Sequence, residues 1–434
     1  MRLYWQRRTP QGPLERDARL LFATRAVRMF GYGLISVVLV LYLASIGIPN
    51  GQIGVFLGLT LAGDAAISLW LTTHADRVGR RKVLLVGAAL MVLAGITVAA
   101  TDLLPALLAA AVVGVISPSG NEVGPFLAVE QASLTETIPA RERTPILAWW
   151  NLVASLSTAA GALVGGVLAG ALIRSGWESA AAYRAVVVGY GVVGLVLAAM
   201  FAQVSAAVEV VDVHDQSVRR RLGLHRSQRT VARLSALFAL DAFGGGFVVQ
   251  SLIAYWFAIR FGAPPGVIGG VLFVANILAG LSALAAARIA GRIGLVRTMV
   301  YTHLPSNVLL ILVPFMPTFE LAVGVLLIRF SISQMDVPTR QSYTMAVVDP
   351  DERSAAAGVT GIARTVGAAA APVISAPLMG LPGLAALPFV IAGSLKITYD
   401  LLLFQGFRSV RPAEEGGGGP DPGPTSGPNG LAPP

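Results

Sequence analysis

Long apolar runs alternate with short polar interruptions along almost the whole chain, from about Leu20 to Gln405. About twelve such runs are present, and most approach the roughly 20 residues that a helix needs to cross a hydrocarbon core of about 30 Å. Only 13% of the residues are charged and 55% are hydrophobic, whereas soluble domains average about 25% charged residues. The pattern therefore predicts an all-α polytopic membrane protein with twelve transmembrane helices.

The positive charges predict how these helices are oriented. Most of the 32 Lys and Arg residues fall in tails and loops on one side, while Arg174, Arg184 and Arg260 fall on the other. By the positive-inside rule, both termini are expected in the cytoplasm and the spans in the cell (inner or plasma) membrane. We expect no cleaved signal peptide, because the basic N-terminus lacks a short apolar core before a cleavage site. The net charge of +9 then follows from topology, and no nucleic-acid partner is expected.

The two halves of the sequence resemble each other. The segment Arg28–Tyr42 (RMFGYGLISVVLVLY) aligns with Asp241–Tyr255 (DAFGGGFVVQSLIAY) at an offset of 213 residues. Three further segments align in the same order at offsets of 210 to 215 residues. The repeat predicts two pseudo-symmetric six-helix bundles, with a substrate site between them near the middle of the membrane.

Composition sets the expected boundaries of these parts. A charged stretch near the middle of the chain, EVVDVHDQSVRRRLGLHRSQRTVAR, predicts a cytoplasmic linker, and the Gly- and Pro-rich end predicts a disordered tail. We therefore expect an N-terminal cytoplasmic tail, a first bundle, a linker, a second bundle and a C-terminal cytoplasmic tail, at residues 1–19, 20–203, 204–232, 233–406 and 407–434.

The most concentrated charge lies between the second and third runs, in THADRVGRRKVLL. A glycine at position 79 permits a tight turn between two antiparallel helices, and the basic residues around it hold the loop on the cytoplasmic side. The core of this stretch resembles a signature of the major facilitator superfamily, G-x-x-x-D-R-x-G-R-R/K. Its matching residues are Asp76, Arg77, Gly79, Arg80 and Arg81.

That resemblance covers about Leu20 to Gln405, and it implies the twelve-helix fold of the family. In the family, the motif's acid docks the first half against span eleven and stabilises the outward-facing state. By resemblance, Asp76 is then a conformational latch. Thr72 stands where the motif has its first glycine. The resemblance also implies a monomer without a cofactor.

A second family motif, typical of drug/proton antiporters, is partly present in span five as SLSTAAGALVGG. Gly161, Gly165 and Gly166 match it, while Ser157 and Ala162 depart from it. Close packing of helices explains such small residues equally well. With this partial match, the chain resembles the bacterial multidrug-efflux-like or uncharacterised permease branch of the superfamily. The resemblance favours export.

Charged residues inside the spans are the most informative positions, because each costs about 2.5–3.5 kcal/mol at the bilayer centre. In the repeat alignment Arg28 pairs with Asp241, and Glu130 with Arg340, so opposite charges occupy equivalent positions. One hypothesis is a cytoplasmic gate of ion pairs between the halves. The alternative is that each charge is satisfied within its own half or lies near the headgroups.

Further candidates lie in spans two, four and twelve. The run SPSGNEVGPF contains two prolines, which predict a break in span four beside Asn121 and Glu122. We predict Glu122 and Asn121 as a proton or substrate site, with Asp64 as a second proton candidate. Lys396 and Asp400, four residues apart, are expected to neutralise each other on one helix face.

These features favour secondary active transport of a small molecule by alternating access, coupled to protons and directed to export. Proton-driven or facilitated uptake is the first alternative, and a non-transporting membrane receptor is the second. The sequence contains no phosphate-binding loop, no cysteine, and only four scattered histidines. We therefore expect no catalytic residues, no metal and no enzymatic activity, and the partners expected are a small solute, protons and the lipid bilayer.

Overall fold

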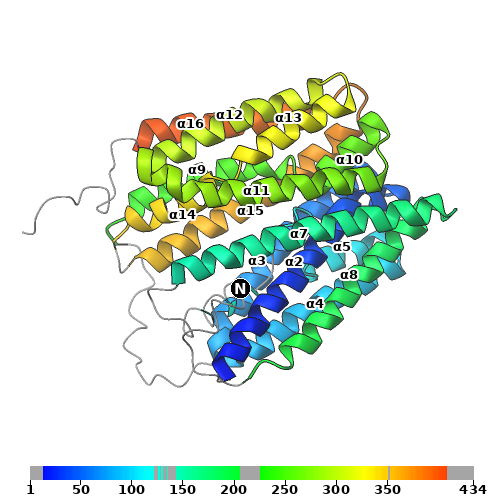
Figure 1. Ribbon diagram of the computed structural model, residues 1–434, viewed down its shortest axis with the longest axis horizontal. Coiled ribbons are helices and arrows are strands. Elements are labelled where there is room, and N and C mark those ends of the chain that lie inside the picture. Colours follow the sequence, from blue (N-terminus) through cyan, green and yellow to red (C-terminus); the bar gives the residue numbers. More distant parts are fainter. Residues whose placement is uncertain are drawn as a thin grey trace, which may run out of the picture.

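The computed structural model describes residues 13–121, 126–127, 129–130, 134, 143–205, 225–349 and 352–407. Within these residues every regular element is a helix. Two groups of helices lie beside each other in Figure 1, the first half of the chain in one and the second half in the other.

The first half contains six helices in the described residues, which are α2 (Pro13–Ser45), α3 (Asn50–Val78), α4 (Arg80–Ala100), α5 (Leu104–Val113), α7 (Arg143–Arg174) and α8 (Ser179–Phe201). The second half begins with α9 (Gln228–Gly246), α10 (Gln250–Phe261), α11 (Pro265–Ile293) and α12 (Leu295–Leu312). It continues with the short η4 (Val313–Phe315), then α13 (Phe319–Ile332), α14 (Asp336–Ala346), α15 (Arg353–Gly380) and α16 (Leu387–Phe407).

The spans of the second half include two that are built from consecutive helices. In the described residues, 11 helical segments are long and apolar enough to cross a membrane, and α9–α10 and α13–α14 each count as one. The apolar α5 is shorter and belongs to span four. This confirms the predicted all-α fold of twelve spans.

The two halves turn in the same way after their second span. Gly79 separates α3 from α4 with a φ of 104°, and Gly294 separates α11 from α12 with a φ of 87°. Residues with a Cβ atom rarely adopt a positive φ of this kind, so only glycine fits here without strain. The two positions are also matched in the sequence repeat.

Helices extend beyond two of the predicted boundaries, since α2 begins before residue 20 and α9 begins inside the predicted linker. Helix α2 begins at Pro13, and Asp17 on it is 1% exposed. The Asp17 carboxylate accepts a hydrogen bond from the Ser205 amide at 3.2 Å, which ties the start of α2 to the chain after α8. Residues 206–224 of the predicted linker and 408–434 of the predicted tail lie outside the described residues.

The end of the linker is fastened by a carboxylate from the second half. Glu352, which precedes α15, accepts hydrogen bonds from the backbone amides of Arg226 at 2.7 Å and Ser227 at 2.9 Å, and from that of His225. The hydrogen bond from the Ser227 side chain, followed by those from the backbone amides, lowers the pKa of Glu352 to about 2. The start of α9 is thereby held against the turn before α15. We call this end of the molecule, where both described chain ends also lie, the linker end (Figure 1).

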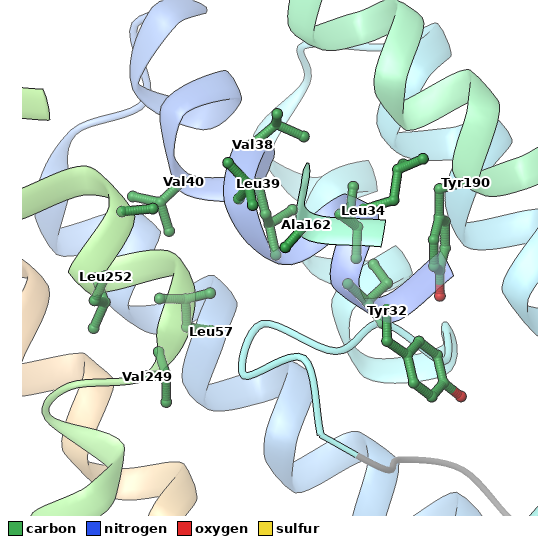
Figure 2. Packing of buried hydrophobic residues seen from close by; sticks show 14 of the residues in the cluster. Tyr32, Leu34, Val38, Leu39, Val40, Leu57, Ala162, Tyr190, Val249 and Leu252 are labelled. Atoms are coloured by element: carbon green, nitrogen blue, oxygen red, sulfur yellow. The ribbon is translucent and has the colours of Figure 1, made fainter. Parts of the chain in front are cut away.

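The halves meet along two pairs of long helices, α7 with α11 and α3 with α15, and α10 adds contacts to α2. Side chains from both halves share one buried apolar cluster. Figure 2 shows part of it, including Val40 of α2, Leu57 of α3 and Leu252 of α10. All three side chains are fully or almost fully buried.

The three glycines of span five allow α7 to approach two different helices. A Cβ atom at Gly161 would collide with the carbonyl oxygen of Phe30, and one at Gly165 would lie 2.5 Å from that of Leu34, both on α2. A Cβ at Gly166 would lie 2.8 Å from the Cα of Gly269 on α11, in the other half. Two of these glycines therefore serve packing within the first half, and the third serves packing between the halves.

We predict that Gly161→Ala lowers the thermal unfolding temperature of the purified protein. The added methyl group collides with the rigid backbone of α2, and overpacking of this kind costs about 1–3 kcal/mol. Gly189→Ala on α8 is the matched control, because nothing lies within 4 Å of a Cβ there and alanine favours the helix. Equal unfolding temperatures for the two variants would contradict the packing role of Gly161.

A second prediction concerns acid stability. A pKa lowered to about 2 from an ordinary value of 4.5 means that the Glu352 contacts stabilise the fold fully above about pH 4.5. This contribution disappears as the pH falls toward 2. In thermal unfolding measured from pH 6 to pH 3, Glu352→Gln should therefore lose less stability than the wild type. Glu178→Gln, at the exposed start of α8, should behave like the wild type.

Candidate functional site

Three spans of the described structure are broken, span ten at residues 333–335 and spans four and seven beside each other. Helix α5 ends at Val113, and residues 114–121 follow without helical structure, with Gly120 at a φ of 69°. Span seven is interrupted at residues 247–249, between α9 and α10. Irregular backbone at membrane depth is tolerated where protein or a water-filled cavity covers it. The break in span four was predicted from its prolines, and the break in span seven was not.

The breaks in spans four and seven contact each other across the interface between the halves. The Pro118 carbonyl oxygen accepts hydrogen bonds from the Ser251 amide at 3.0 Å and from the Ser251 hydroxyl at 2.7 Å. Ser251 lies in the first turn of α10, where backbone amides have no partner inside the helix. The Ser251 amide, which has no partner inside its own helix, thus satisfies the Pro118 carbonyl, which has no helical partner in the broken span.

Polar side chains from both halves surround this contact. Gln250 donates to the Ser36 hydroxyl on α2 at 2.7 Å and accepts from the Asn276 amide on α11 at 3.1 Å. Thr158 on α7 donates to the Gly120 carbonyl at 3.3 Å. We call the side chains of Ser36, Thr158, Gln250, Ser251 and Asn276 the polar junction. They combine amide and hydroxyl donors and acceptors that suit a polar, uncharged group of a solute.

The site residues predicted in spans two and four fall in different surroundings. Asn121 is exposed, and its backbone carbonyl accepts a hydrogen bond from the Ser117 hydroxyl at 2.7 Å. Asp64 on α3 is half-buried and accepts from the Ser68 hydroxyl at 3.4 Å. Glu122 lies outside the described residues. Their roles in substrate or proton binding stay predictions.

The charged turn between α3 and α4 is described in part. Arg80 is 6% exposed, and Arg81 donates a hydrogen bond to the Ala202 carbonyl after α8. The side chains of Asp76 and Arg77, at the end of α3, lie outside the described residues. The latch role of Asp76 therefore stays a prediction.

The first half carries a completely buried ion pair. Two guanidinium nitrogens of Arg28 on α2 contact the two carboxylate oxygens of Glu130 at 2.7 and 2.8 Å, and both side chains are 0% exposed. Thr24 donates to the same carboxylate at 3.1 Å, and the Phe126 ring lies 4.5 Å from the Arg28 guanidinium carbon. Two parallel charge-assisted hydrogen bonds make this a strong and well-oriented pair.

The second half places several charges around Asp241 on α9. Its carboxylate contacts Lys396 of α16 at 2.6 Å, Arg340 of α14 at 2.9 Å and Arg364 of α15 at 3.4 Å. Arg340 also contacts Asp336 of α14 at 2.9 Å. Near Asp241, His303 of α12 hydrogen-bonds to Asp400 of α16 at 2.8 Å. We call Asp241, His303, Asp336, Arg340, Arg364, Lys396 and Asp400 the C-half cluster.

These contacts change the interpretation of the four candidate gate residues. Arg28 pairs with Glu130, and Asp241 pairs with Arg340, so both pairs form within a half. The described contacts give neither of the pairs between halves that the gate hypothesis requires. In this conformation the alternative holds, in which each charge is satisfied in its own bundle.

Lys396 and Asp400, which were predicted to neutralise each other, each have another direct partner. Lys396 reaches Asp241 instead, and Asp400 accepts from Asn307 at 2.9 Å in addition to His303. Sequence reasoning overlooked His303 because its partners are distant in the chain. The available signal was a histidine inside an apolar span, which is itself costly in a membrane. Among the described residues, no group of His, Asp and Glu is arranged to hold a metal ion.

Comparisons with known proteins agree with this architecture. The sequence model of one family, described as Major Facilitator Superfamily, matches residues 21–372. The chain is also 30% identical over 418 residues to the uncharacterized membrane protein YJR124C of Saccharomyces cerevisiae, covering 89% of this chain and 93% of that protein.

Solved structures with the same fold include three transporters. The nucleoside transporter NupG superposes with a TM-score of 0.69 at 12% identity, covering 90% of this chain and 98% of that one. A D-xylose-proton symporter has a TM-score of 0.69 at 15% identity, covering 89% and 97%. An inward-facing, unoccupied bacterial homologue of the human lysosomal transporter Spinster has a TM-score of 0.67 at 15% identity, covering 92% and 96%. At these identities the likeness concerns the fold.

We predict that Arg28→Met destabilises the protein by about 3–5 kcal/mol, because it leaves the buried Glu130 carboxylate without its cation. Thermal or denaturant unfolding of the purified protein measures the loss. The double variant Arg28→Met with Glu130→Met should recover most of it.

Charge exchange separates pairing within a half from pairing between halves. Exchanging the charges of Arg28 and Glu130 should preserve more stability than exchanging those of Arg28 and Asp241. The opposite order would show that Arg28 depends on Asp241 rather than on Glu130.

Proposed function

Because the chain belongs to the Major Facilitator Superfamily, we propose that it is a secondary active transporter that moves a small molecule by alternating access and is driven by protons. It is an integral membrane protein, and its family and fold are those of membrane transporters rather than of enzymes. The observation that carries the proposal is the polar junction, where broken spans of both halves meet.

The polar junction is the proposed substrate site. Parallel repeats bind substrates between the halves near the midplane, using the ends of discontinuous helices. Here the start of α10 and the unwound residues after α5 come from opposite halves, and Gln250 links α2 to α11. A solute that hydrogen-bonds to Gln250 replaces contacts between the halves with contacts to itself. Binding at this position is therefore coupled to their relative movement. Asn121 is the last residue described in the break of span four, and Glu122 follows it in the sequence.

The contacts between the halves at the end opposite the linker end support a conformation of the transport cycle that is closed at that end. The Tyr255 hydroxyl of α10 donates to the Asn50 side chain at 3.0 Å, at the end of the bundle opposite the linker end. Gly380, where α15 ends, lies against the same Asn50 side chain. We propose that the linker end is cytoplasmic and that these contacts close the outer side. Release of the outer contacts, with Asp76 as the latch of the opposite state, completes the cycle.

The proposal also includes the coupling ion and the direction of transport. Carboxylates inside membrane spans can carry protons, and Asp64 and Glu122 are the candidates that the sequence provides. Export is the proposed direction, from the partial antiporter motif of Gly161, Gly165 and Gly166. Uptake driven by protons is the alternative, and a direct flux measurement distinguishes it from export.

The first experiment is a thermal-shift screen of the purified protein with small polar solutes, beginning with a nucleoside and D-xylose. Compounds that stabilise the protein are then tested for flux in proteoliposomes, with and without a pH gradient. Solute movement that follows the gradient supports the proposal. A compound that binds but never crosses the membrane would favour the receptor alternative.

Gln250→Leu should reduce that flux about tenfold or more, because a buried polar partner left unsatisfied costs about 1–3 kcal/mol. Gln203→Leu is the matched control, since Gln203 is exposed and its side chain bonds only one turn back, to the Ala199 carbonyl. If both variants transport alike, the substrate site is not at the polar junction.

A further inference from the structure

The C-half cluster contains more charged residues than are needed to neutralise one buried charge. In the described part of the first half, the Arg28 guanidinium pairs with the Glu130 carboxylate. In the second half, Asp241 contacts three cations at 2.6 to 3.4 Å, and the Nε2 atom of His303 lies 3.9 Å from its Oδ1 atom. This crowding draws attention to the one histidine of the cluster, His303, because imidazole is the side chain that proteins most often use to bind and release protons.

His303 is 4% exposed and has a carboxylate near each ring nitrogen. Its Nδ1 atom lies 2.8 Å from Asp400, and its Nε2 atom is the one that faces Asp241. Asn307 donates to the other oxygen of Asp400 at 2.9 Å and so orients that carboxylate. When the neutral ring donates its one proton from Nδ1 to Asp400, we assign Nε2 as the free acceptor toward Asp241.

The charges of the cluster balance when the imidazole is neutral. The three carboxylates of Asp241, Asp336 and Asp400 are matched by the three cations of Arg340, Arg364 and Lys396. One added proton creates an imidazolium between two carboxylates, and it competes with the cations for Asp241. The ionisable groups that lie nearest to His303 are Asp241 on α9 and Tyr399 and Asp400 on α16. Arg340 of α14, Arg364 of α15 and Lys396 of α16 contact Asp241, and Asp336 of α14 contacts Arg340.

We propose that His303 is a proton-binding site of this protein, with Asp400 and Asp241 as its two carboxylate partners. Hydronium transfers a proton to Nε2, so that one N–H bond forms, one O–H bond breaks and water is released. The imidazolium weakens the hold of Asp241 on Lys396 and Arg364. The site supplements the proton candidates of spans two and four. As a coupling site it rests on the proposed transport function, whereas proton binding itself does not.

The surrounding contacts show how protonation reaches the rest of the molecule. Arg364 links Asp241 to α15, and Ser375 of the same helix donates to the Phe247 carbonyl in the break of span seven at 2.6 Å. Between these two residues of α15, the carbonyl oxygen of Pro372 would lie 2.5 Å from a Cβ at Gly54 on α3, in the other half. A change at Asp241 is thus transmitted along one helix to both the polar junction and the interface between the halves.

Proton binding is tested first without any substrate. Histidine labelled with ¹³C and ¹⁵N is observed by NMR in a protein whose sole histidine is His303, made by replacing His74, His214 and His225 with Gln. We expect its ring to change from one protonated nitrogen to two between pH 8 and pH 5, the range in which histidine usually titrates. A ring that keeps one protonation state throughout this range overturns the proposal, whether or not the protein transports anything.

The conformational consequence is tested by distance measurement between spin labels. The chain has no cysteine, so labels can be attached at Lys82→Cys and Arg297→Cys, two exposed positions related by the repeat. We expect the distance distribution to shift between pH 8 and pH 5 in the otherwise unaltered protein and in His225→Gln, and to stay constant in His303→Gln.

A shift that survives in His303→Gln would refute the role of His303 in the movement. A His303 that titrates and moves the labels, in a protein that carries no solute, would leave the proton site standing and remove the transport proposal instead.

Discussion

A charge that is sealed from water in a moving membrane protein needs a partner that moves with it. Breaking a buried ion pair leaves an uncompensated charge that costs about 3–5 kcal/mol. An obligatory pair across the interface between the halves would incur this cost whenever the halves separate. Arg28 and Glu130, both 0% exposed, avoid it because their helices belong to the same bundle. This constraint explains why the described ion pairs of the buried charges form within a half, while weaker neutral hydrogen bonds connect the halves.

The same constraint gives the sequence repeat a different meaning. Arg28 aligns with Asp241, and Glu130 with Arg340, which suggested pairing between the halves. The structure has the same contact in each half with its polarity reversed, a cation on span one with an anion on span four, and an anion on span seven with a cation on span ten. When one position of a pair reverses its charge, its partner in the same bundle has to reverse too. Opposite charges at equivalent positions therefore indicate compensation within each half.

Features set by local backbone chemistry were predictable, and those set by distant partners were not. The turn at Gly79 and the break in span four follow from glycine and proline, whose backbone preferences are intrinsic. The break at residues 247–249 follows a run of three glycines, but its position depends on Ser251 finding the Pro118 carbonyl 133 residues away. The partners of Lys396 were missed because spacing along one helix favoured Asp400, whereas packing of α16 beside α9 brings Asp241 within 2.6 Å.

Span seven connects the two polar regions that the sequence did not reveal. Asp241 lies on α9, and the break that follows leads directly into Gln250 and Ser251 of the polar junction. A continuous helix would fix the angle between these two sites, whereas the non-helical residues 247–249 let α9 and α10 change direction separately. Ser375 of α15 holds one carbonyl of this break, so the direction depends on where α15 lies. Helix α15 contacts the charged cluster, the break and the opposite half. It therefore provides a direct physical path by which an ionic event in one bundle alters the site that both bundles share.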